Sequence, residues 1–349
     1  MKLILDDSPI AESLYPFTRT RHTSDIRVGI LTIREKWELL TGLKPLKARN
    51  NGEYSGEALI IPANIIPTKA FADLVLERGR PPEQMPEGLR QLKHPWEIFL
   101  FNDQAIREDF ALLRANKNSG SIPDTVQVIS STNVFIEPGA TLGHCMLNAS
   151  TGPIYIGRNA EIMEGSFIRG PFSLGEGSVV KMGSRIYGAT TVGPHCVVGG
   201  EIKNSVLFGY SNKAHDGYLG DSVIGEWCNL GAGTSNSNIK NTAGDVKVWD
   251  NAGKTFSNAG QKCGLLMGDY SRSAINSSFN TGTMVGVCCN VFGEGLTPKH
   301  IPDFTWGNHT LSKYEFEKAL KDIGNWKKLK NQSLTEDDIQ QLKTIFDEL

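Results

Sequence analysis

The sequence predicts a small α/β domain followed by a parallel β-helix and a helical C-terminal segment. Three observations support this fold class. Strand-like and helix-like segments alternate near the N-terminus, aliphatic residues recur every six positions in the middle of the chain, and two amphipathic stretches follow. We expect the three parts to span residues 1–120, 121–300 and 301–349. A chain of 349 residues is long enough for several parts with sizeable cores.

The N-terminal residues combine two kinds of pattern. Residues 2–5 (KLIL) and 57–67 (EALIIPANIIP) are apolar runs typical of buried strands. Helical spacing is found at residues 24–40, 67–79 and 94–116, and Pro67 stands at the start of the second of these. Alternating strands and helices favour an α/β domain, and residues 116–123 (NKNSGSIP) have the composition of a linker.

The β-helix prediction depends on a repeat of six residues. Eight consecutive aliphatic residues keep this spacing: Ile156, Ile162, Ile168, Leu174, Val180, Ile186, Val192 and Val198. A period of six fits neither a helix nor the alternation of one strand, but it fits short strands separated by corners. Three repeats form one coil, so residues eighteen positions apart should stack on one face at the inter-strand spacing of ~4.8 Å.

Two helices are predicted at the C-terminus. Residues 311–329 end in a lysine-rich turn that complements a helix dipole. Thr335 precedes an acidic turn and then one apolar face that continues to Leu349. Both helices are expected to be structural.

Charge and composition argue against several partners. Lys plus Arg total 36 against 38 for Asp plus Glu, so no strong field favours nucleic acid or an anionic membrane. No apolar run approaches the length of a membrane span, and the N-terminus lacks the apolar region of a secretory signal, so we expect a cytoplasmic protein. The six cysteines have neither metal-ligand nor disulfide-scaffold spacing and are interpreted as reduced, buried thiols.

Two cations in the repeat region suggest an anion site. Arg185 and Lys203 are eighteen residues apart, so a regular coil would place their side chains on the same face, one coil apart. Two cations at that spacing repel unless they share an anion, and a phosphate is a common solution. The alternative is that Glu201 or another acid neutralises them on a solvated face.

A histidine lies where the repeat is interrupted. His215 belongs to residues 213–221 (KAHDGYLGD), a place where a solenoid can present a loop to a ligand. An imidazole accepts a proton near neutral pH, so His215 is a candidate general base; the alternative is a surface histidine hydrogen-bonded to Asp216 or Asp221. No three-histidine zinc site is predicted, because His144, His195 and His215 are separated by 51 and 20 residues, which are not multiples of one coil.

Three asparagines follow among small residues. The amides of Asn229, Asn236 and Asn238 are suited to orienting a sugar, an amine or a carbonyl, although asparagine is also common in solenoid turns.

The stretch from His215 to Asn238 resembles the acetyltransferase half of the bifunctional N-acetylglucosamine-1-phosphate uridyltransferase/glucosamine-1-phosphate acetyltransferases. The matching residues, without a gap, are His215, Tyr218 to Asp221 (YLGD), Ile224, Gly225, Asn229 to Thr234 (NLGAGT) and Asn238. Extended backward, the match places Arg185 and Lys203 on phosphate-contacting positions of the family. The resemblance covers about residues 125–295.

This resemblance implies a left-handed β-helix, a homotrimer with active sites between subunits, and acetyl-CoA as the acyl donor. His215 would be the general base, and Asn238 would orient the amine and help to hold the oxyanion. The sugar phosphate and the sugar would be bound by Arg185, Lys203, Tyr218 and Asn229. The expected reaction is acetyl transfer from acetyl-CoA to the amine of an amino-sugar 1-phosphate, in nucleotide-sugar biosynthesis.

The chain departs from the family pattern after Asn238. The position of the family's next phosphate-binding lysine is Gly244, which Lys240 or Lys247 could replace, and residues 241–263 are longer than the family's hairpin. Acyl transfer is therefore better supported than the identity of the acceptor.

The N-terminal domain departs further, because it is short and lacks the family's glycine-rich loop. The first strand is followed by DDSP at residues 6–9, in which two carboxylates would repel a nucleotide phosphate. The domain still looks like a divergent sugar nucleotidyltransferase, for which Mg²⁺ would be the metal. Arg19, Arg27 and Lys36 could bind a nucleotide phosphate or be surface charges. The alternative function is a module that binds sugar phosphate or nucleotide for regulation.

Overall fold

The N-terminal part is built on a parallel sheet in the order β2-β1-β3. In this computed structural model the described residues are 2–49, 58–115, 117–308, 310 and 312–349. The elements of this part are β1 (Lys2–Asp6), η1 (Ala11–Leu14), η2 (Thr23–Asp25), α1 (Ile33–Thr41), β2 (Leu46–Ala48), β3 (Ala58–Pro62) and α2 (Lys69–Arg78). The α/β prediction is confirmed, whereas β2 was missed because only Ala48 of its three residues is buried.

The predicted helix at residues 24–40 is wrong in its first half. α1 begins only at Ile33, after a capping box formed by Thr32 and Glu35. Upstream, three successive backbone amides, from Gly29 to Leu31, donate to side chains of the distant helix α4 (Asn102–Arg114). Those amides are satisfied by tertiary contacts, so the segment has no need of helical hydrogen bonds.

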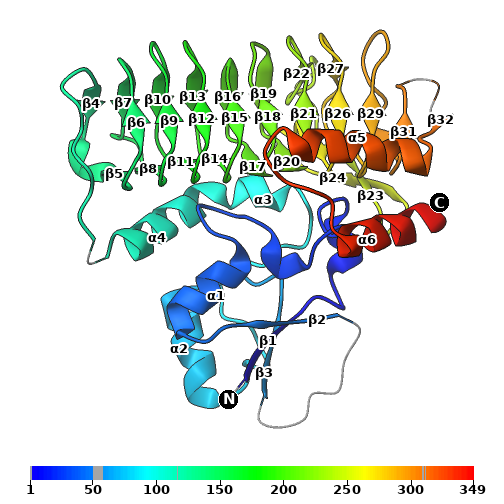
Figure 1. Cartoon of the computed structure of the whole chain (residues 1–349). Coiled ribbons are helices and arrows are strands. Elements are labelled where there is room, and N and C mark those ends of the chain that lie inside the picture. The colour runs from blue at the N-terminus through cyan, green and yellow to red at the C-terminus, as the bar shows by residue number, and fades with distance from the viewer. Residues whose placement is uncertain (1, 50–57, 116, 309, 311) are drawn as a thin grey trace.

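The middle of the chain coils into a β-helix with three sheets (Figure 1). The first sheet contains β4 (Gln127–Ile129), β7 (Met146–Asn148), β10 (Phe167–Arg169), β13 (Arg185–Tyr187), β16 (Glu201–Lys203) and β19 (Tyr218–Gly220). The pair β22 (Ser235–Asn236) and β27 (Ser278–Phe279) follows it, because β22 contacts β19. We call the first sheet with this pair the site face.

The second sheet contains β5 (Val134–Ile136), β8 (Ile154–Ile156), β11 (Phe172–Leu174), β14 (Thr190–Val192), β17 (Val206–Gly209), β20 (Val223–Glu226), β25 (Leu265–Met267), β28 (Thr283–Val285) and β30 (His300–Ile301). The third contains β6 (Thr141–Leu142), β9 (Glu161–Ile162), β12 (Val179–Val180), β15 (Val197–Val198), β18 (Asn212–Lys213), β21 (Asn229–Leu230), β26 (Arg272–Ser273), β29 (Asn290–Val291), β31 (Thr305–Trp306) and β32 (Ser312–Lys313). All neighbours in the three sheets are parallel except β31 and β32, and η3 (Ser131–Asn133) precedes β5.

The six-residue repeat forms the core of the β-helix. All eight predicted repeat residues, from Ile156 to Val198, are at most 1% exposed and belong to one hydrophobic cluster. Close approach of successive coils requires glycine at some corners. A Cβ on Gly193 would lie 1.7 Å from the carbonyl oxygen of Phe208 in the next coil.

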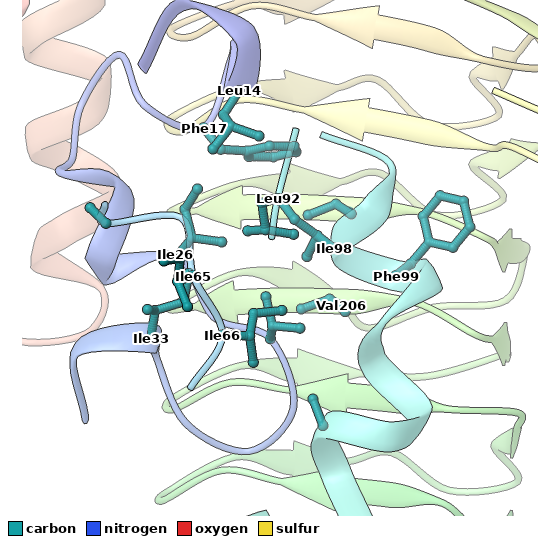
Figure 2. Close-up of a cluster of buried hydrophobic side chains, with 14 of the residues drawn as sticks. Leu14, Phe17, Ile26, Ile33, Ile65, Ile66, Leu92, Ile98, Phe99 and Val206 are labelled. Atoms are coloured by element: carbon teal, nitrogen blue, oxygen red, sulfur yellow. The ribbon is translucent and has the colours of Figure 1, made fainter. Parts of the chain in front are cut away.

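The N-terminal part packs on the second sheet. Outward side chains of that sheet, among them Val206 and Phe208, join the same buried cluster as Phe17 and Ile66 (Figure 2). Helices α3 (Glu97–Leu100) and α4 lie along this sheet, where the Asn102 amide donates to the carbonyl of Ala189 at 2.8 Å. The division into three domains stays a prediction.

The C-terminal helices are α5 (Phe316–Lys328) and α6 (Glu336–Asp347). The predicted start at Leu311 lies outside the described residues. The helix begins at Phe316 because Ser312 and Lys313 pair with β31 instead. With these helices, the predicted fold class is confirmed. The six cysteines are buried and unbridged, as expected. Within the described residues, no helix is both long and apolar enough to cross a membrane.

Candidate active site

Three of the predicted site residues lie on consecutive strands of the site face. Arg185 is on β13, Lys203 on β16 and Tyr218 on β19. Their side chains point outward because the residue beside each one, Ile186, Ile202 or Leu219, points into the core.

The register between these strands differs from the expected eighteen-residue coil. Ile186 lies opposite Ile202, so this coil has sixteen residues. Arg185 therefore lies opposite Glu201, and Lys203 lies opposite Tyr187. The expectation that Arg185 and Lys203 stack directly is wrong. They occupy diagonal positions on neighbouring strands.

The carboxylate of Glu201, on the strand beside Arg185, forms no ion pair with Arg185 or Lys203 in the described part of the chain. It accepts a hydrogen bond of 2.6 Å from the hydroxyl of Tyr187, and this bond raises the Tyr187 pKa to about 12. Arg185 instead donates to the carbonyl of Gly183 at 3.4 Å, and the alternative that a neighbouring acid neutralises the two cations stays a prediction. Lys203 Nζ lies 5.9 Å from the centroid of the Tyr187 ring. Two cations on this face are thus left available to an anion.

Asn238 joins the same face through two side chains. Its Nδ2 donates to the hydroxyl of Tyr218 at 3.2 Å and to the carboxylate of Asp221. The amide of Asn204 donates to the other oxygen of Asp221 at 2.6 Å. Burial, and then the charge of Asp221, raise the pKa of Tyr218, so its hydroxyl keeps the proton that it can donate to a ligand.

His215 lies at the corner that leads from β18 to β19, where its side chain is exposed. Within the described part of the chain, its imidazole forms no hydrogen bond, so the expected alternative partners Asp216 and Asp221 do not hold it. The buried Lys213 instead donates to the backbone carbonyls of His215 (2.6 Å) and Gly199 (3.0 Å). Burial lowers the Lys213 pKa to about 8. This lysine fixes the corner that carries His215.

The remaining asparagines are not part of this cluster. Asn229 lies on β21 of the third sheet, between Asn212 and Arg272, so one copy of the chain does not bring it to the site face. Asn236 is buried, and its amide binds both backbone polar groups of Gly220. Its role here is to connect β19 to β22.

The insertion at residues 241–263 forms the antiparallel hairpin β23 (Lys247–Asp250) and β24 (Thr255–Asn258), which packs against β28. Lys240 donates to the carbonyl of Asp245, and the carbonyl of Lys247 accepts from Lys299 at 3.2 Å. Burial, and then the charge of Lys240, lower the Lys299 pKa. Lys299, which was not predicted, therefore lies near Lys240 beside the Asn238 loop.

The three N-terminal candidate cations are not gathered in one site. Lys36 is buried and paired with Asp109, so it is not a surface charge; both residues line a separate pocket of about 470 Å³ beside α1 and α4. Arg19 binds Asp303 at 3.1 Å and Glu348 at 2.8 Å. Arg27 binds the carbonyl of Ile30 and lies 3.9 Å from Glu35.

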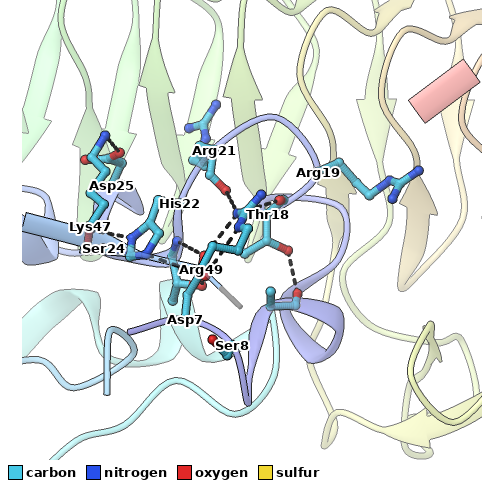
Figure 3. A network of polar contacts seen from close by, with 12 residues as sticks. Asp7, Ser8, Thr18, Arg19, Arg21, His22, Ser24, Asp25, Lys47 and Arg49 are labelled. Carbon is cyan, nitrogen blue, oxygen red and sulfur yellow. Dashed lines mark hydrogen bonds and ion pairs between the residues drawn. The ribbon is translucent and has the colours of Figure 1, made fainter. Parts of the chain in front are cut away.

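A pocket of about 470 Å³ opens at the carboxyl end of β1. The loop after β1 forms one wall and α6 another; the lining includes Ser8, Glu12, Thr18, Arg19, Arg49, Gln341 and Glu348. Four of these residues, Ser8, Thr18, Arg19 and Arg49, are labelled in the polar network of Figure 3, where Arg49 binds the buried Asp7 at 3.0 Å. In open α/β sheets this edge is the usual ligand position.

Asp6 and Asp7, at the end of β1 next to this pocket, already have partners within the protein. Asp7 accepts from Arg49 and from the backbone amide of Thr23, and Asp6 accepts from the amide and hydroxyl of Ser8. The carboxylates of Asp6 and Asp7 are thus already used by hydrogen bonds and an ion pair within the protein.

Comparisons with known proteins give a family-model match at the N-terminus and relatives that match part of the chain. Residues 3–85 match a family model described as sugar nucleotidyl transferase. The chain is 29% identical over 209 residues to the bifunctional sugar-1-phosphate nucleotidylyltransferase/acetyltransferase of Sulfurisphaera tokodaii, a match that covers 59% of this chain and 45% of that protein. It is 30% identical over 198 residues to the bifunctional protein GlmU of Synechococcus elongatus, covering 53% and 43%.

Among solved structures, the Arabidopsis UDP-N-acetylglucosamine acyltransferase matches 64% of this chain and 88% of its own, with a TM-score of 0.31 and 15% identity. The Sulfurisphaera and Arabidopsis proteins are transferases by name. The matches to the two bifunctional relatives span less than half of their lengths. The chain is thus related in sequence to bifunctional sugar-1-phosphate nucleotidylyltransferase/acetyltransferases over part of their length.

Proposed function

We propose that this protein is an N-acyltransferase that moves the acetyl group of acetyl-CoA to the amine of an amino-sugar 1-phosphate. The observation that carries the proposal is the arrangement of the site face. Arg185 and Lys203, which form no ion pair among the described residues, lie on neighbouring strands. The next strand carries Tyr218, which is hydrogen-bonded to Asn238 and follows the corner with the exposed His215. The partial likeness to relatives named as acetyltransferases supports it. The product would serve nucleotide-sugar biosynthesis in the cytoplasm, where acyl-CoA donors are made.

In the proposed mechanism, Arg185, Lys203 and the hydroxyl of Tyr218 bind the sugar phosphate through charge-assisted hydrogen bonds. The amine nitrogen forms a bond to the thioester carbon while the carbon–sulfur bond breaks. The imidazole of His215 takes the proton of the attacking amine and returns a proton to the leaving thiolate. Positioning allows this direct transfer without a covalent enzyme intermediate.

We further propose that the protein acts as a homotrimer with active sites between subunits. Two features support this proposal. Asn229 is remote from the site face within one chain, so only a second copy would bring it to the sugar. The site face also exposes large apolar side chains, with Ile129 and Phe167 at 50% and 55% exposure, which a neighbouring copy would cover.

The test is the release of free coenzyme A from acetyl-CoA in the presence of glucosamine 1-phosphate. His215→Ala should lower the rate about 100-fold or more, since a general base contributes on that order. His144→Ala, which removes another exposed histidine of the β-helix, is the matched control and should leave the rate unchanged. Equal rates for both variants would refute the role of His215, and no release across a panel of amino-sugar phosphates would refute the acyl transfer.

A second candidate function belongs to the N-terminal pocket, which we propose binds a phosphorylated sugar or a nucleotide without transferring a nucleotidyl group. The match to the sugar nucleotidyl transferase model supports the ligand class, and the occupied carboxylates of Asp6 and Asp7 argue against metal-dependent chemistry. Pyrophosphate release from a sugar 1-phosphate plus UTP or dTTP, measured with Mg²⁺, would overturn this proposal. A rise in melting temperature with UTP, without pyrophosphate release, is the expected result.

A further inference from the structure

We propose that Asp221 fixes the orientation of the Asn238 amide and thereby makes the site select an amine over a hydroxyl as the acyl acceptor. Asp221 acts as a positioning residue, since its contacts are to the side chains around the acceptor. This inference rests on the proposed acyl transfer and extends it to the class of nucleophile.

The environment of Asp221 is unusual for a carboxylate. Its side chain is 3% exposed, and among the described residues no lysine, arginine or histidine pairs with it. Two side-chain amides bind it instead, Asn204 on one oxygen and Asn238 on the other. Its backbone is also fixed: the Asp221 amide donates to the backbone carbonyl of Lys203, and the Asp221 carbonyl accepts from the backbone amide of Gly264. A buried charge held in this way by amides alone is costly, which points to a use beyond folding.

The carboxylate determines which end of Asn238 faces the ligand. An ionised carboxylate only accepts hydrogen bonds, so the Asn238 atom that faces it must be the NH₂ group. The two hydrogens of that group are used by Asp221 and by the hydroxyl of Tyr218. Oδ1 of Asn238 accepts no hydrogen bond within the described part of the chain. In this proposal Asn238 offers an acceptor to the substrate and orients its amine, and the oxyanion is left to other donors because both Asn238 hydrogens are engaged.

An acceptor at this position discriminates between nucleophiles. A neutral amine has two N–H groups, one for the base His215 and one for Oδ1 of Asn238. A hydroxyl has a single hydrogen, so when the base takes it, Oδ1 faces an oxygen lone pair without a donor. Sites built to hydrogen-bond a substrate group strongly reject analogues that lack it. We expect a preference of at least about 100-fold for an amine over a hydroxyl at the same carbon.

The test compares glucosamine 1-phosphate with glucose 1-phosphate as acceptors, by coenzyme A release and by mass spectrometry of the acetylated sugar. Asp221→Asn keeps the size of the side chain but adds a donor, so the Asn238 amide can reverse. We expect kcat with the amine to fall about 10-fold or more and the amine-to-hydroxyl preference to fall by a similar factor. The KM for the sugar phosphate should rise by a smaller factor than kcat falls, because Arg185 and Lys203 are untouched and only the Tyr218 hydroxyl, which the reversed Asn238 amide would engage, is affected.

Two further variants complete the experiment. Asp124→Asn makes the same charge change at an exposed position near the start of the β-helix and should leave both rates unchanged. Asn238→Ala removes the acceptor itself and should reduce the preference even if Asp221→Asn does not fold. An unchanged preference in Asn238→Ala, or in a folded Asp221→Asn protein, would overturn this inference while acyl transfer stands. A wild type without coenzyme A release from either acceptor would overturn the proposed function and this inference together.

Discussion

Replacing Lys36 by Met should destabilise the protein by about 3–5 kcal/mol, because the change leaves a buried carboxylate without its cation. Lys36 and Asp109 are 2% and 3% exposed and form an ion pair. Asp109 also accepts from the backbone amides of Ile30 and Leu31 at 2.8 and 3.0 Å, so it cannot turn toward water without releasing them. Methionine fills nearly the same space as lysine. The fall in unfolding free energy therefore reports the unpaired charge of Asp109 and not a cavity.

The melting temperature of Lys36→Met should fall by about 4–7 °C if the chain unfolds as one unit, given an unfolding entropy of roughly 2 cal/mol/K per residue. The loss should depend on pH. Burial already raises the pKa of Asp109, and Lys36 opposes that rise. In Lys36→Met, the Asp109 carboxyl is protonated at low pH, and a neutral carboxyl costs little when buried. As pH rises through its raised pKa, the carboxyl ionises without a cation and the folded state loses stability. The deficit should thus be larger at pH 7 than at pH 4.

Thermal melts of Lys36→Met and of the double variant Lys36→Met/Asp109→Asn test whether the unpaired Asp109 charge causes the loss of stability. The double variant is neutral but keeps an oxygen for the two backbone amides, so it should recover most of the stability. A loss below about 1 kcal/mol in the single variant would refute the reasoning from burial. Unchanged stability combined with weaker nucleotide binding would make Lys36 a ligand-binding residue instead.

Two further predictions concern stability. The His300 ring stacks on Trp249 with 4.5 Å between centroids, and burial lowers its pKa to about 4. The unfolded imidazole binds a proton near pH 6.5, so this histidine costs stability as pH falls from about 6.5 to about 4. Between pH 7 and pH 4.5, the free energy of urea unfolding should fall by about 2 kcal/mol less in His300→Phe than in the wild type. An equal fall in both proteins would contradict this. Gly193→Ala should cost about 3 kcal/mol or more, because its Cβ would overlap the Phe208 carbonyl. Gly183→Ala meets no atom within 4 Å and should cost only the left-handed strain of about 1–2 kcal/mol. Similar melting temperatures for the two alanine variants would show that the coils can separate at low cost.

The sequence by itself determined the β-helix and the strands that carry Arg185, Lys203 and Tyr218. A solenoid repeats one local geometry in every coil, so a periodic pattern is enough to predict it. The same reasoning failed where the period changed. Because the coil between Ile186 and Ile202 is shorter, Lys203 lies opposite Tyr187 and not opposite Arg185. No single residue in the sequence indicates such a change of register.

Tertiary structure decided the partners of the charged and polar side chains. Lys36 pairs with a residue 73 positions away, and Arg19 with one 284 positions away, so no local pattern distinguishes them from ligand-binding cations. In the sequence, Asp221 stood out only as an alternative partner of His215 and as the last residue of the YLGD match, with no role of its own. Its contacts with Asn204 and Asn238 arise because three successive coils place these residues at one corner. Packing between coils, which the sequence of one coil does not contain, therefore decides what the site can bind.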